Sequence, residues 1–232
     1  MISVIIPTFN EAAQIEATII KLRQHDEDNF IVEIIIADGG STDNTILLAE
    51  QMGARIAKAP NKGRAAQMNF GAGMATGSIL YFLHADTIPP PKFSTDIMSC
   101  MQNNFGAGCF RLAFDKDHWF LKANCWFTRF DINAFRFGDQ SLFADIEIFK
   151  KSGGFSEKML VLEDQEFINR IRKITRFTII KKPVITSARK YIENGIYKTQ
   201  VIFFIIYSMY RLGYSQQKLI STYKKMIVQD KL

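Results

Sequence analysis

The stretch SVIIPTFNEAAQIEATIIKL, residues 3–22, decides the fold class, because its hydrophobic pattern changes in the middle. It begins with a short apolar run that Pro7 interrupts, as expected of a buried strand. In its second half, Ile15, Ile19 and Leu22 recur at helical spacing. We therefore predict a strand that is followed directly by a helix.

The same alternation continues along the first third of the chain. The further strand candidates are VEIIIAD (32–38), the weaker ARIAKA (54–59) and SILYFL (78–83). The helix candidates are NTILLAEQMG (44–53), which Gly53 would cap, and GRAAQMNFGAGMATG (63–77), whose small residues permit close packing on a sheet. Strands that alternate with helices indicate βαβ units. The sequence thus predicts an α/β fold with a mainly parallel central sheet and helices on both faces.

The pattern becomes mixed after the triple proline at 89–91. Residues 92–104 are typical of a helix, residues 105–114 of a strand, and residues 118–135 of an aromatic-rich helix. No repeat, linker or low-complexity segment divides the chain. We expect one domain over residues 1–232, with a nucleotide-binding half (1–90), an acceptor and catalytic half (91–190) and C-terminal helices (191–232).

Composition and charge narrow the function classes. The 232 residues suffice for a substantial core, and the net charge of +6 favours an anionic partner. Nucleic acid, a phosphorylated small molecule and an acidic membrane face all satisfy that charge. We expect no nucleic acid, because the basic residues are not interleaved with aromatics on a motif that reads RNA or DNA.

The cysteines and the apolar segments indicate the compartment. Three cysteines without a C-x-x-C pair do not form a disulfide framework, and the N-terminal residues lack the pattern of a secretion signal. The run VIFFIIYSMY (201–210) is shorter than the roughly 20 residues that span a bilayer. A core helix is the favoured interpretation and an interfacial helix beside lipid the second. We expect a cytoplasmic protein, with peripheral contact to the inner face of the membrane as a further expectation.

Carboxylates stand at the ends of the predicted strands. Glu11, Asp38 and Asp86 each follow a strand, and a parallel sheet brings such positions to one rim, where ligands bind. Glu163 and Asp164 open a predicted helix. Simpler interpretations stay open, namely a capping box at TFNE, a turn with a helix cap in DGGSTDNT, and a favourable N-terminal helix charge at Asp164. Neither G-x-G-x-x-G nor a P-loop is present.

The segment FLHADT (82–87) places His84 one residue from Asp86. On an extended strand the two side chains would share a face. A carboxylate beside a diphosphate suits Mg²⁺ or Mn²⁺, since both ions prefer oxygen ligands and share them with phosphates. The imidazole could ligate the metal, donate to a phosphate or cap the strand.

Together these segments resemble glycosyltransferase family 2, the inverting, nucleotide-sugar-dependent enzymes of the GT-A fold. The resemblance covers almost the whole chain through SVIIPTFNE, IIIADGGSTDNT, GRAAQMNFGAGMATG, ILYFLHADT, FGDQSLF, GGF, LEDQEF and TSARKY. It is closest to a small bacterial subgroup associated with arsenosugar biosynthesis, in which FLHADT replaces the usual D-x-D region. His84 then occupies the first acidic position of that motif.

The resemblance implies a role for each motif residue. The implied donor-binding residues are Pro7, Thr8, Asn10, Glu11, Asp38, Gly39, Arg64, His84 and Asp86. Among these, the Asp38 carboxylate would accept from the base N–H, Arg64 would neutralise the diphosphate, and Asp86 would bind Mn²⁺ or Mg²⁺.

For the acceptor side, the resemblance implies that Asp164 is the general base, and Asp139, Gln140 and Glu163 are candidate acceptor contacts. The Q-x-x-R-W motif of processive synthases is absent, which favours transfer without processive polymerisation. The aromatics Trp119, Phe120, Trp126 and Phe127 lie where an acceptor would enter, although aromatics at helical spacing favour a core role.

The leading hypothesis is transfer of a sugar from a nucleotide sugar, with UDP as the expected nucleotide, to an acceptor hydroxyl with inversion. A sugar-1-phosphate nucleotidyltransferase is one alternative, but it would need a Gly-rich basic loop where this chain has PTFNEAAQ. A non-catalytic nucleotide-sugar-binding protein is another, against which Asp86 and Asp164 argue.

Overall fold

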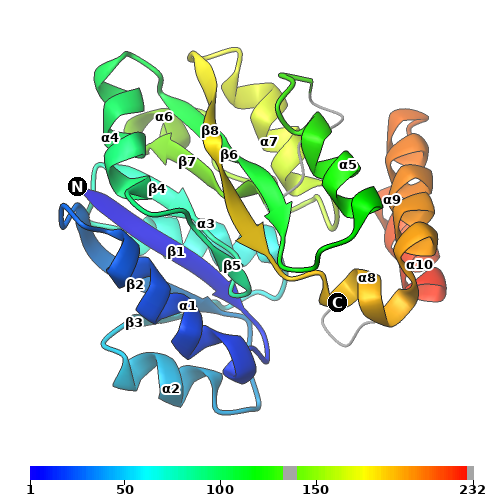
Figure 1. The fold of residues 1–232 in the computed structure, drawn as a ribbon, viewed down its shortest axis with the longest axis horizontal. Helices are drawn as coiled ribbons and strands as arrows, with labels where there is room; N and C mark the ends of the chain where they lie inside the picture. The colour runs from blue at the N-terminus through cyan, green and yellow to red at the C-terminus, as the bar shows by residue number, and fades with distance from the viewer. Residues whose placement is uncertain (133–139, 229–232) are drawn as a thin grey trace.

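In the computed structural model, which describes residues 1–132 and 140–228, the strands form one eight-stranded sheet in the order β3-β2-β1-β4-β7-β6-β8-β5 (Figure 1). The strands are β1 (Ile2–Thr8), β2 (Ile31–Asp38), β3 (Arg55–Lys58), β4 (Ile79–Phe82), β5 (Thr87–Ile88), β6 (Ala107–Phe114), β7 (Leu142–Asp145) and β8 (Phe177–Thr186). The helices are α1 (Ala12–His25), α2 (Thr45–Gln51), α3 (Arg64–Met74), α4 (Phe93–Gln102), α5 (Trp119–Phe127), α6 (Ile146–Lys151), α7 (Glu163–Ile171), α8 (Arg189–Asn194), α9 (Ile196–Arg211) and α10 (Gln216–Met226).

The first half of the sheet is parallel, as the alternation predicted. β1 pairs in parallel with β2 and β4, and β2 pairs in parallel with β3. β7 is antiparallel to both β4 and β6, while β6 and β8 are parallel. The sheet is therefore mixed but mostly parallel, and the mixed pattern after residue 91 corresponds to the insertion of β7.

Helices cover both faces of the sheet, because successive strand residues point to opposite sides. In β1, Val4 and Ile6 join the core beneath α1, α2 and α4, while Ile5 joins the core beneath α3, α6 and α7. The small residues of α3 allow the predicted close approach, since a Cβ added at Gly71 would lie 2.7 Å from Ile5 Cγ2. Burying each such aliphatic side chain contributes about 1.5–3 kcal/mol.

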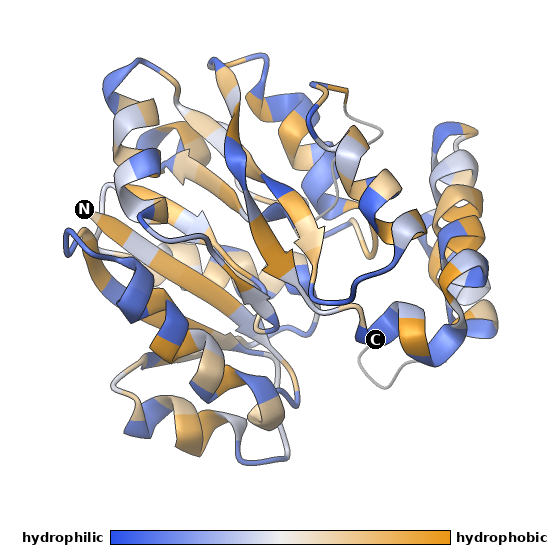
Figure 2. Ribbon diagram, viewed as in Figure 1, coloured by the Kyte–Doolittle hydropathy of each residue, from blue (hydrophilic) through white to orange (hydrophobic). Residues whose placement is uncertain are grey.

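The C-terminal helices α8–α10 pack beside the sheet and have a small core of their own. It contains Ile202, Ile206, Leu219, Tyr223 and Ile227. Figure 2 shows hydrophobic colour in the central strands and again along α9. The core interpretation of residues 201–210 is only half right, because Val201 is 56% and Phe204 is 68% exposed. Within the described part of the chain, no helix combines the length and apolarity needed to cross a membrane.

The aromatic helix α5 differs from the sequence expectation. A core role was favoured for its aromatics, but Trp119, Trp126 and Phe127 are exposed and only Leu121 of this helix is buried. The rings contact one another and Tyr197 of α9 instead, with 4.9 Å between the centroids of Phe120 and Tyr197. The favoured core interpretation was therefore wrong for this helix.

Candidate active site

The loops that follow β1 and β2 interlock at the carboxyl end of the sheet. Asn10 has a left-handed φ of +53°, and its backbone N–H donates to Ser41 Oγ over 2.9 Å. In return, the Asn10 Oδ1 accepts from the N–H of Thr42 over 2.9 Å. Glu11 N–H donates to Thr45 Oγ1, and Ala12 N–H, at the start of α1, donates to Asp43 Oδ2 of the second loop over 3.1 Å, while the N-cap residue Glu11 makes no side-chain cap bond. The capping-box interpretation of TFNE is therefore wrong, since these polar groups join two loops.

Asp38 lies at the centre of this pair of loops and is 1% exposed. Its Oδ1 accepts from Thr8 Oγ1 (3.0 Å) and Ser41 Oγ (2.5 Å), and its Oδ2 accepts from the N–H groups of Gly40 and Ser41 (both 2.8 Å). A carboxylate has about four lone-pair positions, so these bonds satisfy it. The geometry favours the turn interpretation for this carboxylate, and its contact with a base stays a prediction.

Gln67 of α3 contacts the ends of β1 and β2 beside these loops, and sequence reasoning missed it. Its buried Nε2 donates to the carbonyls of Thr8 (2.7 Å) and Ala37 (2.8 Å), at the ends of β1 and β2. A Cβ added at Gly39 would lie 2.9 Å from this nitrogen, so a larger residue there would have to displace the Gln67 amide from its two carbonyls. The only sequence signal was a glutamine among the small residues of a buried helix.

The HAD segment forms a turn. β4 ends at Phe82, and the N–H of Thr87 donates to the carbonyl of His84 over 3.1 Å. Thr18 Oγ1 holds the turn by donating to the Ala85 carbonyl over 2.6 Å. The expectation that His84 and Asp86 share a strand face was therefore wrong, because the alternation of a strand does not extend through a turn.

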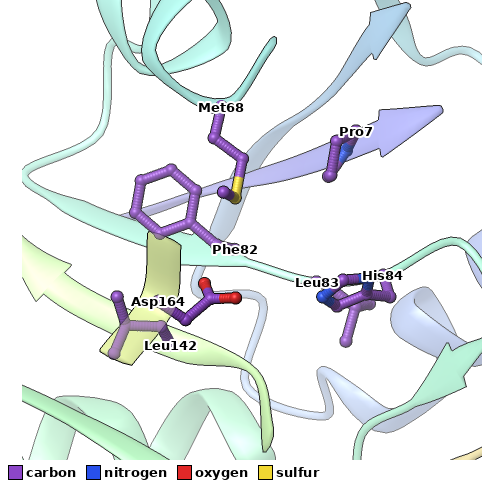
Figure 3. Close-up of a pocket in the computed structure, with 7 residues that line it drawn as sticks. All are labelled: Pro7, Met68, Phe82, Leu83, His84, Leu142 and Asp164. Carbon is purple, nitrogen blue, oxygen red and sulfur yellow. The ribbon is translucent and has the colours of Figure 1, made fainter. Parts of the chain in front are cut away.

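A narrow, closely packed hollow with almost no free volume lies between residues from both halves of the chain, and it is called the narrow pocket below (Figure 3). It is lined by Pro7, Met68, Phe82, Leu83, His84, Leu142 and Asp164. In Figure 3 the carboxylate of Asp164 points into the space between Phe82, Leu142 and Leu83. Asp164 lies in the first turn of α7, is 7% exposed, and follows Leu162 with its left-handed φ of +62°. Asp164 thus shares one pocket with His84 and Pro7.

An ion pair also crosses between the halves. Arg64 Nε, at the first residue of α3, donates to Glu163 Oε1 at the start of α7. The Glu163 side chain is 1% exposed and that of Arg64 is 42% exposed. Arg64 therefore lies beside the Glu163–Asp164 pair.

The remaining predicted site residues that the structure describes do not line the narrow pocket. The Asp86 carbonyl accepts from Ser187 N–H over 3.2 Å, but Asp86 does not line the narrow pocket. Gln140 is buried and its Oε1 accepts from Cys109 Sγ over 3.7 Å, while Asp139 lies outside the described residues. Among the described residues, no group of three or more His, Cys, Asp or Glu side chains could hold a metal ion.

Comparison with known proteins identifies the fold and the family. The sequence model of Glycosyl transferase family 2 matches residues 3–155. A PGL/p-HBAD biosynthesis glycosyltransferase of Mycobacterium bovis is 38% identical over 92 residues, which cover 37% of this chain and 35% of that protein. The aligned part of this chain thus spans about a third of the length of such relatives.

Two solved structures share the fold. Staphylococcus aureus TarS 1–349 in complex with UDP-GlcNAc has a TM-score of 0.68 at 14% identity, covering 95% of this chain and 70% of its own. A mannosyltransferase from Pyrobaculum calidifontis in complex with GDP-Man and Mn²⁺ also has a TM-score of 0.68, at 18% identity, covering 92% of this chain and 65% of its own. The predicted α/β fold of the GT-A type is confirmed, and because the family model spans most of the sequence, the chain belongs to glycosyl transferase family 2.

Proposed function

We propose that this protein transfers a sugar from a nucleotide sugar, with a UDP sugar preferred, to an acceptor hydroxyl with inversion and without processive polymerisation. The observation that carries the proposal is the shared pocket of Pro7, His84 and Asp164. It joins the end of β1, the turn after β4 and the first turn of α7. A donor at this rim would have its sugar beside a carboxylate.

Asp164 would act as the general base. It takes the proton of the acceptor hydroxyl while that oxygen bonds to the anomeric carbon and the bond from this carbon to the diphosphate oxygen breaks. A single displacement inverts the anomeric centre. The Arg64–Glu163 ion pair would hold the start of α7 against the donor half, so that Asp164 stays aligned with the sugar.

The leaving diphosphate needs positive charge. Arg64, 42% exposed, can offer guanidinium N–H groups to phosphate oxygens. His84 and Asp86 lie on one turn and would supply a nitrogen and an oxygen donor to a Mn²⁺ or Mg²⁺ that takes its other ligands from water and the diphosphate. When bound there, the ion would neutralise charge on the leaving group.

Donor and acceptor selectivity belong to the same proposal. The wall around the nucleotide base would be formed by Thr8, Asn10, Glu11, Asp38 and Gly39. Asp38 would contribute by holding the loops in shape through its hydrogen bonds. Glu163, Gln140 and Asp139 are proposed acceptor contacts. The finer assignment to the FLHADT subgroup associated with arsenosugar biosynthesis rests on residues 82–87.

The two alternatives predict different chemistry. A nucleotidyltransferase would release pyrophosphate from a nucleoside triphosphate and a sugar phosphate, while a non-catalytic binder would hold a nucleotide sugar without cleaving it. The loop after β1 is closed by its bonds to the loop after β2 rather than rich in glycine and basic residues, which disfavours the first. The pocket position of Asp164 disfavours the second.

The test is a binding screen followed by a turnover assay. UDP, GDP and dTDP sugars are titrated with and without Mn²⁺, and thermal shift and calorimetry report binding. We expect a response to UDP sugars that strengthens with Mn²⁺ and is followed by slow UDP release. Binding of none of the nucleotides would contradict the proposal, and binding without any turnover would favour the non-catalytic alternative.

We also propose a cytoplasmic location with peripheral contact to an anionic membrane surface. Residues 189–228 carry seven Lys or Arg and a single acid, Glu193. The adjoining surface exposes Val201, Phe204 and, on α5, Trp119. Cosedimentation with phosphatidylglycerol vesicles should fall on Phe204→Ser; equal sedimentation of variant and wild type would contradict this contact.

A further inference from the structure

A second hollow, which the proposed chemistry does not use, lies between the C-terminal half of β6, α5 and β8. This cleft has a volume of about 510 Å³. Figure 1 shows α5 running beside β6, and Leu112 N–H fixes the end of α5 there by donating to Thr128 Oγ1 over 3.2 Å. Its floor includes Arg111 to Phe114, and its walls include Leu121, Trp126 and Pro183.

The cleft is strongly basic. Its cationic lining residues are Arg111, Lys116, Lys122, Arg129 and Lys181. Among the residues that the structure describes, two acids, Asp115 and Asp117, line it, and both are engaged. Asp117 pairs with Lys122 over 2.8 Å, and Asp115 Oδ1 accepts from Ala188 N–H over 2.8 Å. The cleft thus keeps an excess of three positive charges.

Arg111 is the residue that points to a ligand. Its Nε is buried and has no hydrogen-bond partner within residues 1–132 and 140–228. Leaving a buried charged donor unsatisfied costs free energy, which a small shift of the half-buried Arg111 side chain toward an oxyanion in the cleft would recover. Guanidinium groups bind phosphate through two parallel hydrogen bonds, so a phosphate monoester matches both the charge and the donor geometry.

A bulge in β8 adds a second cation. Phe110 of β6 pairs with Ile180 and Arg111 with Pro183, so that Lys181 and Lys182 lie outside the ladder. Lys182 forms an ion pair with Asp96 over 2.7 Å. Lys181 lines the cleft and has no ion pair among the residues that the structure describes. Bulges redirect side chains, and here Lys182 pairs with Asp96 while its neighbour Lys181 lines the cleft.

β6 connects the cleft to the pocket of Asp164. Cys109 pairs with Leu142, and Leu142 lines that pocket. Arg111 lies two residues further along β6 and shares a face with Cys109, at a spacing of about 7 Å. The cleft and the pocket of Asp164 are therefore lined from neighbouring strands, β6 and β7.

We propose that the cleft binds the phosphate group of the acceptor while the acceptor hydroxyl reaches Asp164. The inference rests on the proposed function for the second contact, whereas anion binding in the cleft can be measured without it. The phosphate can belong to a soluble ester or to a lipid headgroup, since both offer at least two terminal oxygens to a guanidinium group.

The first arm titrates sn-glycerol 3-phosphate into the full chain, with and without saturating UDP and Mn²⁺, by calorimetry. The dissociation constant should rise about tenfold in Arg111→Gln and about threefold in Lys181→Gln. Lys182→Gln removes the same charge at the neighbouring position, and it should leave the dissociation constant unchanged. If Arg111→Gln does not fold, the comparison of Lys181→Gln with Lys182→Gln tests the proposal without it.

The second arm measures cosedimentation with phosphatidylglycerol vesicles. Sedimentation that falls in Arg111→Gln while glycerol phosphate fails to bind would assign the cleft to a lipid phosphate. If both probes are insensitive to Arg111→Gln, or if Lys181→Gln and Lys182→Gln weaken binding equally, the proposal is overturned. Failure of the proposed function would show separately, as absence of UDP binding in the wild type with the cleft titration intact.

Discussion

The proposed donor rim, formed by residues 8–11 and 38–45, and the proposed acceptor side, formed by β6, α5 and the start of α7, differ in how their polar groups are bonded. In the rim, loops bond to each other, and Asp38 alone accepts four hydrogen bonds. On the acceptor side, Arg111 Nε and Glu163 Oε2 are buried without a hydrogen-bond partner in the described residues. The rim is thus held by hydrogen bonds between its own loops, and we propose that the two buried atoms on the other side meet the substrate.

The largest expected effect tests where the chemistry lies. Asp164→Asn should lower UDP release from the bound UDP sugar by about 10²–10⁴-fold, because it removes the proton acceptor. UDP affinity by calorimetry should be unchanged. Glu166→Gln is the matched control, since Glu166 lies in the same helical turn but pairs with Arg170 over 2.5 Å. Turnover retained in Asp164→Asn, or lost equally in Glu166→Gln, would remove the general-base assignment.

The next effect should come from the centre of the rim. Asp38→Ala leaves four donors without their acceptor, so we expect the free energy of unfolding without ligand to fall by about 3 kcal/mol. UDP affinity should fall as well, because the loop loses its shape. Urea unfolding and calorimetry measure the two quantities. Asp43→Ala, which removes acceptors from Ala12 N–H and Thr45, should cost only about 1 kcal/mol. Weaker UDP binding at unchanged stability would instead indicate direct base recognition.

The parallel half of the sheet could be predicted from sequence, because its signals are local. The apolar run of β1 and the helical spacing of Ile15, Ile19 and Leu22 each lie within one segment. The carboxylates at strand ends were found for the same reason. Asp164 entered the site through the resemblance of LEDQEF to the family, and its pocket position required the fold.

Other features depend on contacts that no single segment contains. Gln67 supports the rim because its amide donates hydrogen bonds to the carbonyls of Thr8 and Ala37, which are 59 and 30 residues away in the sequence. The aromatics of α5 show helical spacing, but spacing cannot tell a face buried in the core from one left exposed. The end of β4 at Phe82 was missed because a turn can follow a strand without a change in hydrophobicity. The cleft needs β6, α5 and the β8 bulge together.

A moderate effect is expected where α3 supports the rim. Gln67→Leu preserves volume but removes the donor for Thr8 and Ala37, leaving two buried carbonyls unsatisfied. We expect the free energy of unfolding to fall by about 1–3 kcal/mol in urea titrations. Gln51→Leu, at an exposed position of α2, is the matched control and should be neutral. Unchanged stability in Gln67→Leu would show that the rim holds its shape without this amide.

The smallest effect should appear at the opposite end of the strands from the rim, at Glu33 near the start of β2. Burial alone would raise the pKa of this carboxyl, but hydrogen bonds from Thr76, Ser3 and Arg55 together lower it below the usual value. A lowered folded-state pKa stabilises the fold above the unfolded pKa, and this contribution is lost as pH falls through the folded-state value. The difference in unfolding free energy between wild type and Glu33→Gln should therefore be present at pH 7 and shrink in acid. Glu16→Gln, an exposed control on α1, should match the wild type at pH 7. If the difference in unfolding free energy between wild type and Glu33→Gln does not change with pH, the charge of Glu33 adds nothing to the stability of the fold.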